Sequence, residues 1–348
     1  MKPKKSIAEA FAGITGLVLT LLISFAMVVA LILLLSKMPA KTILAFFAGP
    51  FKNPYYFGNM LASAVPLVFT GLAVAVAFKS SVFNLGGEGQ VYAGGLAATA
   101  VCLALPAANG LLGGVAAMAG AMLISGFLSG LSGFFRMKWN ADEMISSFLL
   151  SSAIILVVNY FITGPLDDPN NNLLATLPIA KQYAMAKIYA PSKLNTSVFV
   201  ALATAVLVWF FMARTHAGYE MRMCGLNREF SRYGGINVSR YMVLPMVIGG
   251  ALNGLAGGLL VAGTYGSCIK GFSGGLGWNG IAVALIARNN PLAVIPAALL
   301  FAYLDAGAKA AMLHGDVTFE IAAIAQSFIF YFVTAQSLYS LARRRKAA

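Results

Sequence analysis

Two glycine-rich segments carry polar and aromatic residues where the surrounding chain is apolar. The first segment, residues 83–90, reads Phe83-Asn84-Leu85-Gly86-Gly87-Glu88-Gly89-Gln90. The second segment, residues 272–279, reads Phe272-Ser273-Gly274-Gly275-Leu276-Gly277-Trp278-Asn279, and both contain Gly-Gly-x-Gly. Glycine is a poor helix former and permits backbone conformations that other residues avoid. Each segment therefore predicts a break in a helix, beside side chains that can bind a solute.

The polar and aromatic members of the two segments are candidates for a solute pathway through a membrane. Irregular backbone is tolerated at membrane depth only where it is buried in protein or lines a water-filled cavity. Aromatic rings suit a flat heterocycle and amides suit hydroxyl or ring-nitrogen groups, although the same rings could instead pack between helices. The candidate pathway residues are Phe83, Asn84, Glu88, Gln90, Phe272, Trp278 and Asn279.

Two roles are open for Glu88. An ionisable residue inside a bilayer is costly and marks a functional site by default. Alternatively, Glu88 lies at the membrane interface, where it caps a helix or pairs locally, for instance with Lys79. Asp305 and Lys309 lie four residues apart on one predicted helix, which is the spacing of an ion pair. We favour a structural role for that pair.

The sequence lacks the patterns that common enzymes require. It has no Gly-x-x-x-x-Gly-Lys-Ser/Thr stretch and so no ATP-binding loop of its own. Residues 275–280 match a dinucleotide-binding pattern, but they follow an apolar helical run instead of a strand. Three scattered Cys and two isolated His residues form neither a metal-binding spacing nor a nucleophile–base set. We therefore expect no catalytic residue, metal site or cofactor in this chain.

The composition assigns the chain to the lipid bilayer and to the all-α class. Hydrophobic residues make up 59% and charged residues 10% of the 348 residues, whereas soluble domains hold roughly 45–50% and 25%. A spanning helix needs about 20 apolar residues, and about ten runs qualify. They are residues 11–36, 60–78, 82–104, 110–134, 145–164, 195–213, 242–265, 275–288, 291–312 and 319–341.

The two glycine-rich segments predict an inverted repeat of five plus five helices with broken helices. One segment opens the third run and the other opens the eighth, and an odd and an even span cross the membrane in opposite directions. We expect one transmembrane domain over residues 1–348, with halves 1–174 and 195–348. Residues 165–194 form the predicted extracytoplasmic loop, called the outer loop here. Residues 213–241 form the predicted cytoplasmic loop, called the inner loop.

The basic charge follows the predicted topology. A formal net charge of +13 would indicate nucleic acid in a soluble protein, but basic residues of membrane proteins gather on the cytoplasmic side. With both termini cytoplasmic, sixteen of the 24 Lys and Arg residues lie inside. We predict this orientation and no nucleic-acid partner.

Each loop has an active and a passive interpretation. Residues 226–233 of the inner loop favour a short helix that ends at Gly234-Gly235. Such a helix could lie in the headgroup layer or dock into a groove on a partner. The outer loop is long enough to receive a soluble partner, and a passive solvated loop is equally compatible.

Four segments resemble one family of membrane proteins. Residues 83–90 are similar to the Phe-Asn-Ile/Leu-Gly-x-Glu-Gly-Gln signature of ABC importer permeases for nucleosides and related compounds, within the ribose and branched-chain amino acid permease group. Asp142-Glu143-Met144-Ile145-Ser146-Ser147 resembles the Glu-Val-Ile-x-Thr element of that family. Residues 218–236 resemble its coupling segment, and residues 280–291 its Ile-Ala-Val-Ala-Leu-x-Gly-x-x-x-Pro element.

The resemblance implies a multi-subunit importer in the bacterial cytoplasmic membrane. Two permease chains would form the pore, and a heterodimer is favoured over a homodimer. Cytoplasmic ABC ATPases, which use ATP and Mg, would bind the inner loops, and a substrate-binding lipoprotein would deliver the solute from outside. The residues implied to couple to the ATPase are Arg222, Gly225, Asn227, Arg228, Tyr233, Gly235 and Ile236.

The resemblance favours a purine nucleoside as the cargo. Riboflavin-like compounds and simple sugars, imported by the same mechanism, are the alternatives. An ion-coupled secondary transporter or channel would be a protein of another class, and it would use Glu88 and Asp305 as coupling sites. A membrane-embedded enzyme is the least favoured interpretation, because the sequence shows no catalytic constellation.

Overall fold

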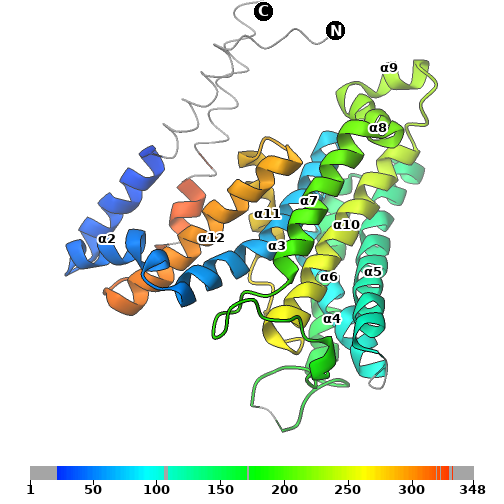
Figure 1. Ribbon diagram of the computed structural model, residues 1–348. Helices are drawn as coiled ribbons and strands as arrows, with labels where there is room; N and C mark the ends of the chain where they lie inside the picture. Colours follow the sequence, from blue (N-terminus) through cyan, green and yellow to red (C-terminus); the bar gives the residue numbers. More distant parts are fainter. Residues whose placement is uncertain are drawn as a thin grey trace, which may run out of the picture. The chain divides into compact units, whose positions relative to one another are not determined.

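The described part of the chain is helical. The computed structural model describes residues 22–105, 109–170, 172–318, 320–321, 323–328 and 331. Helices joined by loops account for these residues, and the β-type pairs among them are three isolated bridges (Figure 1). The all-α class predicted from composition is confirmed for this part of the chain.

In the part of the chain that the structure describes, six helices are long and apolar enough to cross a membrane, by length and composition. They are α3 (Pro54–Lys79), α5 (Gly110–Trp139), α6 (Glu143–Ile162), α7 (Ser197–Arg214), α10 with its π-helical end (Arg240–Tyr265) and α12 (Pro291–His314). Three further predicted runs coincide with the helix Leu22–Leu35, α4 (Gly87–Ala104) and α11 (Leu276–Ile286). The run 319–341 lies largely outside the described residues, so the helix count and the inverted repeat stay predictions.

The stretch between the first two predicted spans is helical as well. It contains α2 (Pro39–Ala48) and a short 3₁₀ turn (Gly49–Phe51). Proline at the first helical position favours helix initiation because its φ is already helical. A helix of 10 residues is too short to register as a spanning run, which is why the sequence analysis missed it.

Contacts divide the chain into two units. The larger unit holds residues 61–299, and the smaller unit holds residues 1–60 and 300–348. This division does not test the predicted halves. Within the smaller unit, α2 packs against the later part of α12, where the Tyr303 hydroxyl donates to the Phe47 carbonyl at 3.1 Å. A Cβ on Gly49 would lie 2.3 Å from the Cβ of Ala310, so the two elements touch closely.

Glycines let three helices of the larger unit touch at the backbone. The helices α4, α5 and α10 contact one another, and α4 also contacts α6 and α11 (Figure 1). A Cβ on Gly94 of α4 would lie 2.4 Å from the Cα of Gly254 in α10. A Cβ on Gly250 would lie 2.4 Å from the carbonyl oxygen of Ser125 in α5. Small residues at helix interfaces allow this approach, which positions the glycine-rich segments against α10.

Candidate functional site

Hydroxyl groups on α6 hold the backbone of the first segment. The N–H of Leu85 donates to Ser147 Oγ at 3.0 Å, and the N–H of Gly89 donates to Ser151 Oγ at 2.8 Å. Ser147 and Ser151 are buried and lie one helical turn apart on one face. The break before α4 therefore has hydrogen-bond partners for backbone groups that could not remain bare in a bilayer.

An ion pair fixes the start of the same segment. Glu143, one turn before Ser147 on α6, is buried and pairs with Arg136 at the end of α5. Its Oε1 also lies 3.4 Å from the N–H of Phe83. Asp142 caps α6, because its side chain accepts the N–H groups of the first turn. Glu143, in the stretch identified by resemblance, thus positions the first segment and is itself buried.

Two amides of the first segment lie in a buried polar cluster. Asn84 and Gln90 exchange two hydrogen bonds, each 3.0 Å long. Asn84 also donates to Ser129 Oγ of α5 at 3.2 Å, and Asn253 of α10 donates to Gln90 Oε1 at 2.8 Å. All four residues are buried. Their amides bind mainly to one another, although Asn253 Oδ1 has no hydrogen-bond partner in the described part of the chain, so the cluster supports the segment from its buried side.

The Glu88 carboxylate joins the two glycine-rich segments. Its Oε1 accepts the Ser273 hydroxyl and the Gly275 N–H, the latter at 3.0 Å. Its Oε2 accepts the Gly277 N–H at 2.9 Å. Sequence reasoning left Glu88 between a pathway role and a local pair, and the structure places its hydrogen bonds on the second segment.

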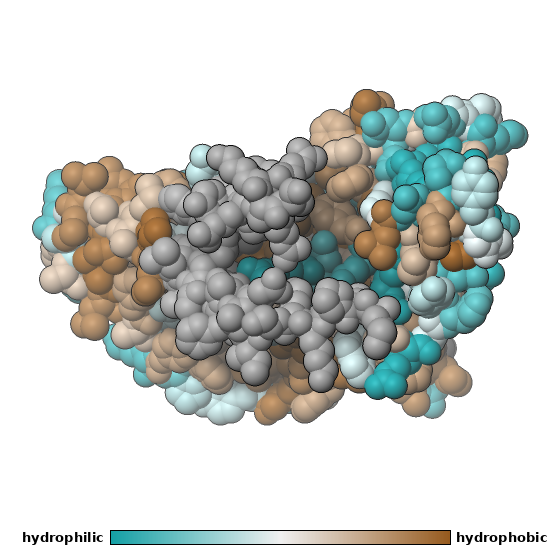
Figure 2. Space-filling view, turned by 90° about the horizontal axis from the view of Figure 1, so that it is seen from above, coloured by the Kyte–Doolittle hydropathy of each residue, from teal (hydrophilic) through white to brown (hydrophobic). Residues whose placement is uncertain are grey.

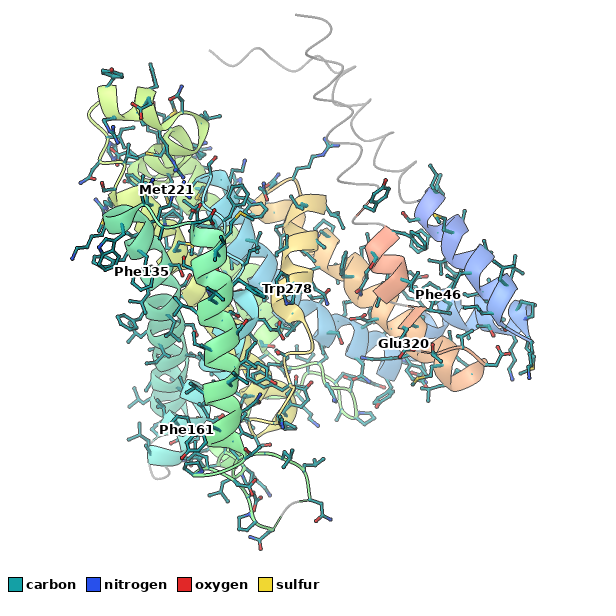
Figure 3. The ribbon with its side chains drawn as sticks, turned by 180° about the vertical axis from the view of Figure 1, so that it is seen from behind. Phe46, Phe135, Phe161, Met221, Trp278 and Glu320 are labelled. Carbon is teal, nitrogen blue, oxygen red and sulfur yellow. The ribbon has the colours of Figure 1, made fainter. Side chains whose placement is uncertain are left out.

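The aromatic candidates divide into packed and exposed rings. Phe272 is buried and stacks on Tyr92 with ring centroids 5.0 Å apart. Trp278 is 46% exposed and Phe83 is 39% exposed. Figure 3 shows Trp278 on α11, and its ring lies 6.1 Å from that of Phe148. Asn279, the remaining candidate, is partly exposed on the first turn of α11. Two rings thus remain open to a flat solute.

The outer loop is hydrogen-bonded to the chain that leads into the second segment. The Thr176 N–H donates to the Cys268 carbonyl at 3.0 Å, and the Lys270 N–H donates to the Leu174 carbonyl at 2.8 Å. Isolated bridges pair Ala175 with Ile269. Because the second segment begins two residues after Lys270, the outer loop and the segment are parts of one connected structure.

The inner loop contains two helices, α8 (His216–Leu226) and α9 (Arg228–Tyr233). Asn227 caps α9 by accepting the Phe230 N–H at 3.0 Å. Helix α9 ends at Gly234, and Gly235 follows with φ +79°, in the left-handed region. The predicted short helix and its glycine end are confirmed. Hydrophilic side chains gather over this end of the larger unit (Figure 2).

Two predicted coupling residues, Gly225 and Arg228, contact the turn after α3 instead of pointing outward. The Gly225 carbonyl accepts the Ser81 hydroxyl at 2.6 Å, and Arg228 Nη2 donates to the Ser81 carbonyl at 2.7 Å. A Cβ on Gly225 would lie 2.1 Å from the Lys79 carbonyl oxygen. Ser81 has φ +50° and lies two residues before the first segment. The inner loop is therefore fastened to the turn that leads into that segment.

The remaining coupling candidates point outward or stabilise the loop. Tyr233 is 90% exposed, and Arg222 Nε donates to the Gly218 carbonyl at 3.2 Å. Ile236 belongs to a shallow groove on this loop. The groove is lined by His216, Tyr219, Glu220, Met223, Phe230, Ser231, Gly234 and Ile236.

Sequence reasoning named Glu143 and Ser147 only within a family resemblance, and it assigned no supporting role to them, to Ser151 or to Asn253. Glu143, Ser147 and Ser151 recur every four residues, and Asn253 interrupts an apolar run. Polar residues within a spanning helix are costly and therefore informative, so this spacing was the available signal. Among the residues that the structure describes, no group of three or more His, Cys, Asp or Glu could hold a metal ion.

Long apolar helices with buried, hydrogen-bonded breaks are features of a membrane permease. The chain belongs to the family described as branched-chain amino acid transport system, permease component, which residues 56–334 match. The family resemblance inferred from four segments is thereby confirmed.

Relatives with different cargoes share most of the chain. The "Probable riboflavin import permease protein RfuC" of Treponema pallidum is 34% identical, over 91% of this chain and 84% of the relative. The "Guanosine ABC transporter permease protein NupP" of Bacillus subtilis is 32% identical, over 83% and 84%. The "Glucose ABC transporter permease protein TsgB13" of Haloferax volcanii is 29% identical, over 92% and 87%.

These findings assign the chain to the ABC transporters and, within them, to the permease subunits. It is a permease subunit of an ABC transporter and not an enzyme, and the ATPase is a separate subunit. The names of its relatives differ in the solute carried, so they do not determine the cargo.

Proposed function

We propose that this permease imports nucleosides, with a purine nucleoside as the first cargo, in the bacterial cytoplasmic membrane with both termini inside. The observation that carries the proposal is the meeting of the two segments at Glu88, flanked by the partly exposed rings of Phe83 and Trp278. A purine ring can stack on such rings. The hydroxyl groups of a ribose can hydrogen-bond to polar groups of the two segments.

Riboflavin is the second candidate cargo. The riboflavin permease is 34% identical to this chain and the guanosine permease 32%. Both solutes combine a fused heteroaromatic ring with a polyhydroxylated group, which suits stacking on one side and hydrogen bonding on the other. A simple sugar lacks the ring, so exposed aromatic residues would contribute less to its transport.

The partners follow from the class and from exposed surfaces. An ABC ATPase that uses ATP and Mg would bind the inner loop, and a substrate-binding lipoprotein would bind the outer loop. In the most apolar stretch of α3, 78% is buried inside the protein. In the corresponding stretch of α6, only 22% is buried. Lipid and a second, different permease chain would cover the exposed faces of α5, α6 and α7. No nucleic acid is expected as a partner.

The test is uptake by the assembled transporter. The chain is co-expressed with its ATPase, a second permease and the lipoprotein in cells that lack nucleoside uptake, and labelled guanosine is supplied. We expect uptake that guanosine and related purine nucleosides compete for, and that survives brief treatment with an uncoupler. Competition by riboflavin alone would move the assignment to riboflavin, and immediate collapse with the uncoupler would contradict ATP drive.

Tryptophan variants test the pathway. Trp278→Ala should lower guanosine uptake by about tenfold, because one stacking contact is worth roughly 1–3 kcal/mol. Trp139→Ala is the matched control, since Trp139 is exposed at the end of α5 and belongs to neither segment. Normal uptake by Trp278→Ala would remove this residue from the pathway.

A further inference from the structure

Among the described residues, one carboxylate makes the side-chain hydrogen bonds that join the two glycine-rich segments. Ser273, Gly275 and Gly277 each donate one hydrogen bond to Glu88, and both carboxylate oxygens are used. Hydrogen bonds to a charged acceptor are roughly twice as strong as neutral ones. The hydrogen bonds between these segments therefore depend on a single side chain.

The same carboxylate lies between the beginnings of two helices. Glu88 is in the first turn of α4, and Gly277 is in the first turn of α11. Each helix start carries about half a positive charge and unpaired N–H groups. A Cβ on Gly277 would lie 2.1 Å from the backbone nitrogen of Glu88. The two helix starts are thus in direct contact, and the negative carboxylate at the start of α4 accepts N–H groups at the start of α11.

The second segment adopts a special conformation to reach Glu88. Gly274 and Gly275 have φ +52° and +83°, in the left-handed region. A Cβ at either position would meet no atom within 4 Å, so packing does not require glycine there. The conformation does, because it turns the Gly275 and Gly277 N–H groups toward the carboxylate.

We propose that Glu88 is a positioning residue whose carboxylate bridges the two segments in the resting transporter, and that opening this bridge is a step of each uptake cycle. The inference rests on the proposed transport function. The bridge joins two segments that are distant in sequence and that flank the candidate pathway. Because the bridge consists of hydrogen bonds at the start of α11, these bonds can break without unfolding either helix.

Reversible cross-linking tests the opening step. The pair Tyr92→Cys and Gly271→Cys lies beside the two segments, where the Gly271 N–H donates to the Tyr92 hydroxyl, and it leaves Glu88 in place. It is introduced into a chain whose three buried cysteines, Cys102, Cys224 and Cys268, are replaced by alanine. The full complex with ATPase and lipoprotein is placed in proteoliposomes without nucleotide and treated with a short cross-linker that forms a disulfide with each thiol. We expect the pair to cross-link, uptake to be lost, and a reductant to restore it, while the ATPase stays bound. The single-cysteine variants are the matched controls.

Two results would overturn the bridge. One is a cross-linked complex that keeps its uptake, because the segments would not need to part. The other is absence of a cross-link in the nucleotide-free complex, because the segments would not be adjacent. Failure of the proposed function looks different, since the unmodified complex would then show no ATP-driven uptake before any cysteine is introduced.

A second variant keeps the inference testable if the cysteine pair fails to fold. Glu88→Gln keeps the size of the side chain but turns one acceptor atom into a donor that faces N–H groups. We expect basal ATP hydrolysis without solute to rise and the solute-stimulated fraction to fall, each by about tenfold for the loss of a charged hydrogen bond. Glu88→Asp, which keeps the charge, should restore part of the stimulation.

The control for the charge change is Glu320→Gln. Glu320 is exposed in the smaller unit (Figure 3), so its neutralisation should leave both ATPase rates unchanged. If Glu88→Gln keeps wild-type basal and stimulated rates, the carboxylate does not hold the resting state and the proposal fails.

Discussion

Gln90 links the other two amides of the buried cluster, Asn84 and Asn253. Its Oε1 accepts from both Asn84 and Asn253, at 3.0 and 2.8 Å. Removing it would leave two buried donors without an acceptor, and each such group costs about 1–3 kcal/mol. A cluster of this kind stabilises one arrangement of α4 and α10 because an alternative packing would leave the amides unpaired.

Replacement of Gln90 by leucine should therefore destabilise the protein. We expect Gln90→Leu to lower the free energy of unfolding by roughly 2–6 kcal/mol, the cost of two unpaired N–H groups, measured as a lower unfolding temperature in detergent. The exposed Gln182→Leu in the outer loop is the matched control. An unchanged unfolding temperature for Gln90→Leu would show that water replaces the lost acceptor.

The environment of Asp316 predicts that the stability of the smaller unit depends on pH. Its carboxylate accepts the Ser36 hydroxyl and the Lys37 N–H, each at 2.5 Å, and the hydrogen bond from Ser36 is the main cause of a pKa below the usual value. A carboxyl whose pKa is lower in the folded protein stabilises it at pH values above the unfolded pKa of about 3.9. That stabilisation is lost as the pH falls through the folded pKa.

Measuring the unfolding temperature at a series of acidic pH values checks the predicted contribution of Asp316 to stability. The unfolding temperature should fall as the pH drops below about 4, and the fall should be smaller in Asp316→Asn, which has no carboxyl to protonate. Equal acid sensitivity in the two proteins would assign the effect to other carboxyl groups.

At the scale of helices, the glycines fall into two groups. Some pack against another helix, and others have no described atom near the position of a Cβ. Gly94 touches the backbone of α10, whereas a Cβ on Gly114 of α5 would meet no described atom within 4 Å. The sequence analysis could see both as glycines in apolar runs, but not which of them face another helix. That distinction depends on tertiary packing, which a local pattern does not contain.

Alanine substitution at the two glycines should have opposite effects. Gly94→Ala places a Cβ 2.4 Å from Gly254, so it should push α4 and α10 apart and abolish folding or lower the unfolding temperature strongly. Gly114→Ala should stabilise α5 by about 1 kcal/mol, the difference in helix propensity. Thermal unfolding in detergent compares them, and similar effects of both would contradict the observed packing.

The turn between α3 and the first segment connects the inner loop to the candidate pathway. Arg228 binds the Ser81 carbonyl, whereas Arg232 on the same short helix pairs with exposed Glu229 at 3.8 Å. A pulling force on α9 would therefore reach the turn through Arg228. The two arginines have the same charge and lie in the same helix, so they form a matched pair for testing this transmission.

Arg228→Gln should uncouple the transporter. We expect the ATPase to remain bound and to hydrolyse ATP, with uptake per ATP falling several-fold because the turn no longer follows α9. Arg228→Lys should retain part of the coupling, and Arg232→Gln should retain the ratio of the wild type. Uptake per ATP that is equal in Arg228→Gln and Arg232→Gln would show that the Ser81 contact is only structural.

At the scale of the whole molecule, apolar runs predicted where helices form but not how they meet. Long runs such as the one that became α5 follow from composition, and the helical end at Gly234-Gly235 follows from local glycine preferences. The contact between Glu88 and Gly277 joins residues far apart in sequence, so no local pattern predicts it. The inward orientation of Gly225 and Arg228 was missed for the same reason.

At this scale, the proposed binding of the ATPase to the inner loop can be tested by a deletion. Deleting residues 225–234 removes α9 and its flanking residues but leaves the spanning helices intact. The shortened permease should reach the membrane and should no longer co-purify with its ATPase. Retention of the ATPase would place the docking surface elsewhere on the cytoplasmic side.

The negative charge of Glu88 bears on which solutes can leave the cell. The start of α11, which could attract a phosphate group, already has a carboxylate as its partner. A phosphate ester that approached would meet a negative charge, and the Gly275 and Gly277 N–H groups are already hydrogen-bonded to it. Under the proposed function, a cell that phosphorylates its cargo after entry would keep the product, because the route that admitted the neutral solute repels its anionic derivative.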